Sequence, residues 1–393
     1  MLALRLARGA RPAVQLRRLL VALASGGTGF LLLCALGYAL GHPQQPGTAA
    51  VRLGWCLVPL AGTADFAVAV ARGDPGTRPR PGIFAAGLGP VRLAAFATLT
   101  TVLSGLIGSA LALVAFLHLR GDLVDLPLAG AAGGLLAAGR PLPVAALVLL
   151  LVVTPLVSGV TVALALRPGG RPASARPPEV LDDLERPAPA GRRAAGLAWG
   201  VALCVAGLAV ETSVDGPVRG AAKLTLPQEV AGGSPRVLTG WVLTACGLAL
   251  AGPALAFACG RLLRTARPNG VRLLAGRLLQ QEAGRVGRPL GVLCAVASGV
   301  YAAAVLPVGP TAGGGALALG GALLVVGCAV GTLAMAAVEA RRSRARTTAA
   351  LLRLGAPAGT LRIAAALRAG ALLVLFGPLT WGVAALVALP LGG

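Results

Sequence analysis

The stretch PVAALVLLLVVTPLVSGVTVALAL, Pro143–Leu166, decides the fold class because it holds no charged side chain over its whole length. About 20 apolar residues in a helix span the hydrocarbon core of a bilayer. A helix is favoured there because it satisfies its backbone hydrogen bonds within one segment. The stretch therefore predicts a transmembrane helix. The rest of the chain repeats the pattern, since 56% of its residues are hydrophobic, 12% are charged and the mean hydropathy is +0.82.

Further apolar runs bring the total to about nine spans of the length that a bilayer requires. They predict an all-α, polytopic transmembrane protein. The expected spans are Leu19–Gly41, Leu53–Ala71, Leu93–Leu117, Pro143–Leu166, Ala194–Val210, Val237–Gly260, Leu290–Leu306, Ala316–Val338 and Ala369–Pro390. The fifth and the seventh are the shortest of these.

Basic residues are distributed unequally between the two sides of this predicted bundle. With the N-terminus in the cytoplasm, 29 of the 35 Lys and Arg residues lie on the cytoplasmic side. The outer side keeps Arg52, Arg120, Arg140, Arg219, Lys223 and Arg236. Positively charged loops tend to stay in the cytoplasm. The distribution therefore predicts a multi-pass protein of a cell inner or plasma membrane, with a cytoplasmic N-terminus and the first span retained as a signal-anchor.

The formal net charge of +22 raises the question of a nucleic-acid-binding protein. The arginines are dispersed at the ends of spans without an aromatic stacking platform, which argues against nucleic acid. Anionic membrane lipids and an acidic cytoplasmic partner are the two explanations that the pattern favours. One lysine against 34 arginines, with abundant alanine and glycine, is typical of a GC-rich genome and favours a bacterial source.

Two pairs of similar segments indicate an internal duplication, as in many transporters. LVALASG at Leu20–Gly26 resembles LCAVASG at Leu293–Gly299. GLGPVRLAAFATLTTVL, from Gly87, resembles RLGAPAGTLRIAAALRAGALL, from Arg353. We therefore expect a first repeat of four spans at 1–166, a Pro- and Arg-rich cytoplasmic linker at 167–193, two intervening spans at 194–262, and a second repeat of three spans at 263–393.

Small residues fill the predicted spans. Gly105 and Ser109, in SGLIGSALA, have the small-x-x-x-small spacing that lets two helices approach closely in a membrane. Such spacings are frequent at this glycine and alanine content, so they predict tight helix packing in general rather than one dimer interface.

Motifs of catalysis and of cofactor binding are absent from the sequence. The only lysine, Lys223, has no P-loop around it, and His42 and His118 lie far apart. The seven cysteines form no C-x-x-C pair, so neither a zinc site nor a disulfide framework is indicated. We expect no enzymatic activity, no cofactor and no metal.

Asp65, in AGTADFAVAVAR, is the one carboxylate within a predicted span. A charge inside a membrane is costly and is often functional. One interpretation is a proton or ion relay. The other is a carboxylate that faces the helix bundle, pairs with an arginine or bonds to a neighbour such as Thr63, and only helps packing. The sequence favours the second, because it holds no further intramembrane acid or histidine.

The cytoplasmic segment EARRSRARTTAALLRLGAP, Glu339–Pro357, follows the eighth span. After its basic burst we expect a short helix with Leu351, Leu352 and Leu354 on one side, ended by Gly355 and Pro357. Such a helix either lies on lipid as an amphipathic surface helix or docks a soluble partner.

These residues resemble the FtsX/MacB-type permeases, the membrane subunits of one class of ABC transporter. In that family, a basic turn after the second span of each half leads into an apolar short helix ending in L-G-A, and the next span starts with a basic residue. RRSRARTTAALLRLGAPAGTLR, Arg341–Arg362, has this order, and RPRPGIFAAGLGPVR, Arg78–Arg92, is a weaker copy. Gly252–Leu279 resembles the approach to the second half in duplicated members.

The resemblance implies two FtsX-like repeats whose short helices contact a separate cytoplasmic ATPase. It also implies mechanical transmission instead of a wide pore, and a homodimer or a second permease in the assembly. The matching positions are Leu88 and Gly89 in the first half, and Arg346, Leu351, Leu352, Arg353, Leu354 and Gly355 in the second.

Two features depart from the family. The gap after the first span, about His42–Arg52, leaves no room for the family's large outer domain. Duplicated members also tend to have a fourth span in the second half, whereas the sequence given ends at Gly393, directly after the third, so we expect a C-terminus on the outer side, a shortened sequence or a degenerate second half. The sequence thus predicts the permease subunit of an ABC-type export or lipid- or peptide-handling system. The alternative is a secondary transporter or a non-transporting membrane scaffold, with Asp65 as the coupling group.

Overall fold

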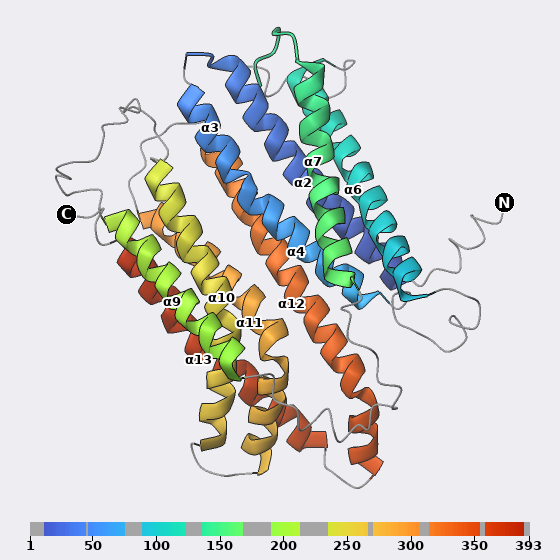
Figure 1. Ribbon diagram of the computed structural model, residues 1–393, viewed down its shortest axis with the longest axis vertical. Helices are drawn as coiled ribbons and strands as arrows, with labels where there is room; N and C mark the ends of the chain where they lie inside the picture. The colour runs from blue at the N-terminus through green and yellow to red at the C-terminus, as the bar shows by residue number, and fades with distance from the viewer. Residues whose placement is uncertain are drawn as a thin grey trace. The chain divides into compact units, whose positions relative to one another are not determined.

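The computed structural model describes residues 12–44, 46–74, 89–122, 136–167, 190–212, 235–265, 270–305, 314–353 and 358–388 (Figure 1). Within these ranges all regular structure is helical, which confirms the all-α fold. Seven of the described stretches are long and apolar enough to cross a membrane: Val14–Gly41, Pro46–Gly73, Val91–Arg120, Val144–Leu166, Thr239–Thr265, Leu319–Arg341 and Arg362–Ala385. The chain is a multi-pass membrane protein by these criteria.

Two of the nine expected spans do not meet the same criteria. The fifth lies on α9, Ala190–Thr212, whose apolar stretch Gly196–Val210 is short for a bilayer. The seventh lies on α11, Gly270–Val305. That helix carries Arg272, Arg277, Glu282, Arg285 and Arg288. Its uncharged part begins at Pro289, and the end of the expected span, Leu306, lies outside the described residues, so this span stays a prediction.

The second expected span, Leu53–Ala71, is not one helix. It begins earlier, as α3, Pro46–Trp55, and continues as α4, Leu57–Gly73, with a turn at Cys56. Pro59 explains the interruption, because it has no N–H to donate to the carbonyl of Trp55 and its ring crowds that oxygen.

Apart from α7, which begins one residue later than expected, the other helices extend the expected spans at one or both ends. They are α2, Pro12–Gly41; α6, Pro90–Arg120; α7, Val144–Leu166; α10, Pro235–Thr265; α12, Gly314–Arg353; and α13, Ala358–Ala388. Proline opens α2, α6 and α10, a first-turn position where no N–H is needed. Gly121 ends α6 in the left-handed conformation with φ 93°, and the amide of Asp122 donates to the carbonyl of Leu117 at 3.0 Å. This is a Schellman end.

The chain forms two compact units. Unit 1 comprises residues 1–169, 224–232 and 310–332, and so holds α2, α3, α4, α6, α7 and the first half of α12. Unit 2 comprises residues 170–223, 233–309 and 333–393, and so holds α9, α10, α11, α13 and the second half of α12. The sequence-based domain boundaries stay a prediction, and most of the linker at 167–193 lies outside the described residues.

Unit 1 is organised by a close contact between α2 and α6. A Cβ added at Gly26 would lie 2.9 Å from the carbonyl oxygen of Gly108, and one added at Gly108 would overlap the carbonyl oxygen of Ala22. Next to this contact, a Cβ on Gly105 would meet Pro155 of α7 at 3.0 Å. The tight packing predicted from the small residues is thus present, and it depends on glycines that let two backbones touch.

In unit 2, α10 packs between α9 and α11. A Cβ on Gly200 of α9 would lie 2.7 Å from the amide nitrogen of Ala251, and one on Gly287 of α11 would lie 2.5 Å from the nitrogen of Pro253. α11 also packs against α13, where the Cys294 thiol donates to the carbonyl of Phe376 at 3.7 Å. Each of these interfaces again places small residues where helices meet.

Candidate functional site

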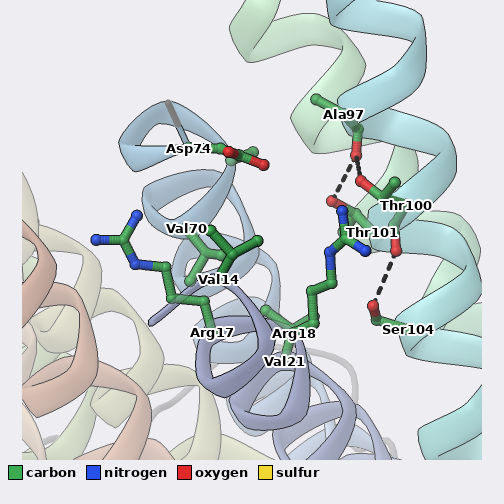
Figure 2. Close-up of a pocket in the computed structure, with 11 residues that line it drawn as sticks. Val14, Arg17, Arg18, Val21, Val70, Asp74, Ala97, Thr100, Thr101 and Ser104 are labelled. Atoms are coloured by element: carbon green, nitrogen blue, oxygen red, sulfur yellow. Dashed lines mark hydrogen bonds between the residues drawn. The ribbon is translucent and has the colours of Figure 1, made fainter. Parts of the chain in front are cut away.

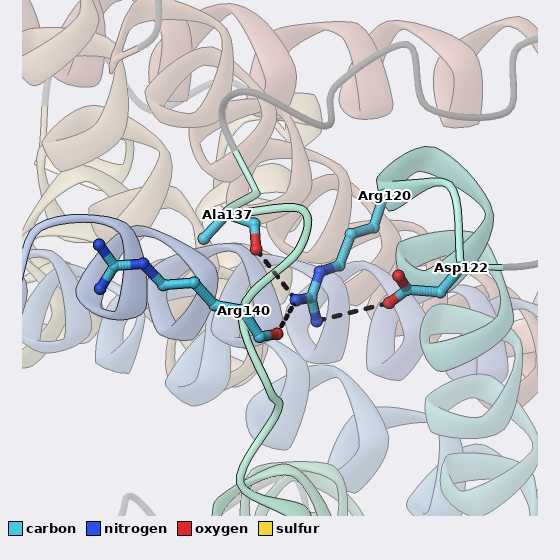
Figure 3. Close-up of polar contacts among 4 residues, drawn as sticks. All are labelled: Arg120, Asp122, Ala137 and Arg140. Atoms are coloured by element: carbon cyan, nitrogen blue, oxygen red, sulfur yellow. Dashed lines mark hydrogen bonds and ion pairs between the residues drawn. The ribbon is translucent and has the colours of Figure 1, made fainter.

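Arg120 forms a polar clasp at the end of unit 1 where α6 stops (Figure 3). Its residue surface is only 3% exposed. One guanidinium nitrogen, Nη2, donates to the carbonyl oxygens of Ala137, at 2.9 Å, and of Arg140, while Nη1 lies 3.4 Å from Asp122. Arg140 in turn donates to the carbonyl oxygen of Leu40 at 2.9 Å. The two arginines therefore tie the loop at 136–143 to the ends of α6 and α2.

An apolar cluster lies beneath this clasp. Leu33, Cys34, Phe116 and Leu136 are nearly fully buried against one another. A Cβ on Gly37 would lie 3.4 Å from the Cα of Leu136, so the loop sits directly on α2. The clasp thus holds a hydrophobic lid over this end of the α2–α6 pair.

Midway along α2, hydroxyl groups join three helices. Thr28 and Thr63, both fully buried, share a hydrogen bond of 2.7 Å between their Oγ1 atoms. Each also lies within bonding distance of the carbonyl oxygen of Ala24, at 3.0 and 3.4 Å, and Thr63 Oγ1 lies 4.0 Å from the Cys328 thiol of α12. In a medium without water, such pairs hold helices together.

Three other buried hydroxyls of unit 1 lack a hydrogen-bond partner among the described residues. They are Ser109 on α6, and Thr154 and Ser158 on α7, each at most 1% exposed. They are small groups on the faces that pack, which fits a role in close helix approach. We assign them no ligand.

A small pocket opens between α2, α4 and α6 at the other end of the same bundle (Figure 2). Arg17 and Arg18 line it from α2, Asp74 from the end of α4, and Thr100, Thr101 and Ser104 from α6. Arg17 is 7% exposed and donates to the carbonyl of Gly73 at 2.6 Å, which satisfies the C-terminal end of α4. Arg18 is exposed.

The two arginine sites lie one membrane thickness apart. Arg18, at the pocket, and Leu40, whose carbonyl accepts from Arg140 of the clasp, are 22 residues apart on α2, which is about 33 Å at 1.5 Å per residue. That is close to the thickness of the hydrocarbon core, about 30 Å. The pocket around Arg18 and the clasp around Arg120 are therefore about as far apart along α2 as the two edges of a bilayer core, and the hydroxyl cluster of Thr28 lies between them.

Asp65 lies on α4 at the depth of this hydroxyl cluster. Its neighbours Thr63, Ala64, Phe66 and Ala67 are buried, whereas Asp65 itself is exposed. The carboxylate is thus on the face of α4 opposite to the bundle interior. Whether it couples an ion gradient stays a prediction.

The predicted docking residues fall on an extension of α12. Arg346, Leu351, Leu352 and Arg353 lie in this helix, and Gly89 caps the start of α6. Leu88, Leu354 and Gly355 lie outside the described residues. The expected separate short helix is corrected, because α12 runs without a break from Gly314 to Arg353. The basic burst contains no Gly or Pro, so nothing in it interrupts a helix.

One ion pair of unit 2 was not predicted from the sequence. Arg368 of α13 lies 3.5 Å from Glu282 of α11, and both side chains are largely buried. Glu282 lies in a polar, arginine-rich stretch that the sequence predicts to be cytoplasmic. The sequence therefore gave no reason to expect Glu282 in contact with a predicted span. The clasp of Arg120 was missed as well, because its main acceptors are backbone carbonyls and these have no sequence signature.

Among the described residues, no group of three or more His, Cys, Asp or Glu side chains is placed so that it could bind a metal ion. Cys34, Cys56, Cys259, Cys294 and Cys328 are buried thiols, as expected for small packing residues. Comparisons with protein-family models, with curated proteins and with solved structures each gave no match. The functional argument therefore rests on the residues and geometry above.

Proposed function

We propose that this chain is the permease subunit of an ABC-type export or lipid- or peptide-handling system, driven by a separate cytoplasmic ATPase. The observation that carries the proposal is α12, a single helix of 40 residues. At 1.5 Å per residue it is about 60 Å long, twice the hydrocarbon thickness of a bilayer. Its last turns, with Arg346, Leu351 and Leu352, therefore exceed the length that a bilayer requires and continue a span without a break.

The other half of α12 is seated in unit 1. Val325 and Cys328 lie against Gly62 of α4, and the ring of Phe66 covers Gly331. We propose that a force applied to the basic end of α12 is passed along this one continuous helix to α4. This arrangement supports mechanical transmission, which the resemblance to FtsX/MacB-type permeases also implies.

The pairing of helices inside each unit supports the duplication. Ser25 of α2 donates to the carbonyl of Gly105, 80 residues later, and Cys294 of α11 donates to that of Phe376, 82 residues later. Both pairs join the first span of a predicted repeat to its third, at nearly the same offset. Two FtsX-like repeats would give this correspondence.

The remaining parts of the proposal concern the surroundings of the chain. The basic cytoplasmic segments suit an acidic surface on the ATPase, and a homodimer or a second permease would complete the transporter. The location we propose is a bacterial inner membrane with the N-terminus in the cytoplasm.

Replacing both Leu351 and Leu352 by Asp is expected to abolish co-purification of the ATPase. Two carboxylates in place of apolar anchors at an interface centre typically cost at least tenfold in affinity. The measurement is the ATPase-to-permease ratio after a mild-detergent pull-down. Leu262→Asp, on an exposed leucine near the end of α10, is the matched control and should leave the ratio unchanged. Equal ratios for both variants would refute docking at α12.

The exposed, midmembrane position of Asp65 favours a second candidate, a secondary transporter. In that case Asp65→Asn would abolish proton-dependent uptake in vesicles, because the amide cannot exchange a proton. Under the ABC proposal, ATP-driven transport is retained in this variant. Transport that needs Asp65 and no ATP would replace the first function by the second.

A further inference from the structure

The pocket at the cytoplasmic edge of unit 1 combines apolar and polar walls. Val21 of α2, Val70 of α4 and Ala97 of α6 form the apolar part, whereas Arg18 and Thr101 belong to the polar part. A wholly polar ligand would gain no binding energy from the apolar part, and an acyl chain would gain none from the polar part. The pocket therefore suits an amphiphile whose polar head lies at the level of Arg18.

The charges of the pocket favour an anion. The lining includes two guanidinium groups, those of Arg17 and Arg18, and one carboxylate, that of Asp74, so it carries one net positive charge. Arg17 uses Nη1 to hold the carbonyl of Gly73, but a guanidinium has five N–H donors. Figure 2 shows Arg18 directed toward the α6 wall, beside Thr100 and Thr101. A phosphate diester there would accept charge-assisted bonds from Arg18.

The hydroxyl groups on α6 refine the choice of head group. Thr100 and Thr101 both donate to the carbonyl of Ala97 at 2.9 Å, and Ser104 donates to that of Thr100 at 2.9 Å. Their hydrogens are thus used within the helix, so toward a ligand these oxygens can act only as acceptors. A ligand that carries its own hydroxyl donors beside the phosphate complements such a wall, as a glycerol head group does.

We propose that this pocket binds one anionic phospholipid of the inner leaflet, with the phosphate on Arg18 and the hydroxyls of a glycerol-type head group on Thr100 and Thr101. The position at the membrane edge distinguishes it from a site for free phosphate, because the depth along α2 places the apolar wall within the hydrocarbon. The lipid would join α2, α4 and α6, the helices that hold the hydroxyl cluster of Thr28.

The test compares the wild-type chain with Arg18→Gln and Arg72→Gln after exchange into a lipid-free detergent. Arg72 is exposed at the same end of α4 and is not part of the pocket, so its variant removes the same charge at the same membrane edge. Short-chain phosphatidylglycerol, short-chain phosphatidylcholine and inorganic phosphate are the three probes. Native mass spectrometry counts the bound molecules per chain.

We expect one phosphatidylglycerol per chain for the wild type and for Arg72→Gln, and at least about tenfold weaker binding for Arg18→Gln, since a charge-assisted bond is lost. Thr101→Val should weaken the binding of phosphatidylglycerol and leave the binding of phosphatidylcholine unchanged. This second variant tests the proposal even if Arg18→Gln fails to fold. Equal binding by the two arginine variants would overturn the proposal. So would displacement of the lipid by inorganic phosphate at equal concentration, which would indicate a free-phosphate site.

Discussion

Gly108→Leu is expected to destroy the folded form of unit 1. The Cβ that any other residue adds at Gly108 overlaps the carbonyl oxygen of Ala22, and it lies 2.9 Å from the amide nitrogen of Gly26. These neighbours are backbone atoms of α2, so the helices themselves must separate. Overpacking costs about 1–3 kcal/mol even where side chains give way, and we expect about 3 kcal/mol or more here.

The measurement is the fraction of monodisperse protein after heating in mild detergent, followed by size-exclusion chromatography. Gly377→Leu on α13 is the control, because a Cβ at Gly377 meets no atom of the described structure within 4 Å. We expect the control to behave as the wild type and Gly108→Leu to aggregate or fail to accumulate. Equal thermal midpoints for the two variants would mean that α2 and α6 do not touch at these glycines.

Arg120→Ala is expected to have the second largest effect, by opening the hydrophobic lid that the clasp holds on unit 1. The substitution leaves the carbonyls of Ala137 and Arg140 without their donor, and each buried unpaired group costs about 1–3 kcal/mol. Because Leu136 then no longer covers Cys34, a maleimide should label that thiol at least about tenfold faster, in proportion to the opened population. Mass spectrometry of the labelled peptide measures the rate.

Asp122→Asn tests the contribution of the ion pair separately from that of the hydrogen bonds to the two carbonyls. Its carboxylate lies 3.4 Å from Arg120 but is 41% exposed, and an exposed pair is worth at most about 1 kcal/mol. We expect labelling of Cys34 in this variant close to the wild-type rate. A labelling rate for Arg120→Ala that stays at the wild-type level would show that the loop is held by other contacts.

Sequence patterns predicted the parts of the fold that depend on solvent. Apolar runs such as Pro143–Leu166 correspond to helices because a bilayer permits little else. The small spacing of Gly105 and Ser109 predicted close packing, although it left open that α2 is the partner of α6. The interruption at Cys56 was missed, since a single proline often remains inside a membrane helix, as Pro155 does in α7.

Polar contacts were harder to predict than helices. The bond from Arg17 to the carbonyl of Gly73 joins residues 56 positions apart, and the main acceptors of Arg120 are likewise backbone atoms. A backbone carbonyl is the same for every residue, so composition and spacing carry no information about it. Asp65 attracted attention because its side chain is charged, whereas the paired hydroxyls of Thr28 and Thr63 look ordinary in a sequence.

The proposed docking of an ATPase on α12 is tested most directly by a pull-down of the tagged wild-type chain in mild detergent. Mass spectrometry and an ATPase assay of the eluate, with and without prior crosslinking, give the readout. The proposal predicts a stoichiometric ATPase and ATP hydrolysis that the chain alone does not perform. A clean, inactive eluate that persists after crosslinking would contradict it.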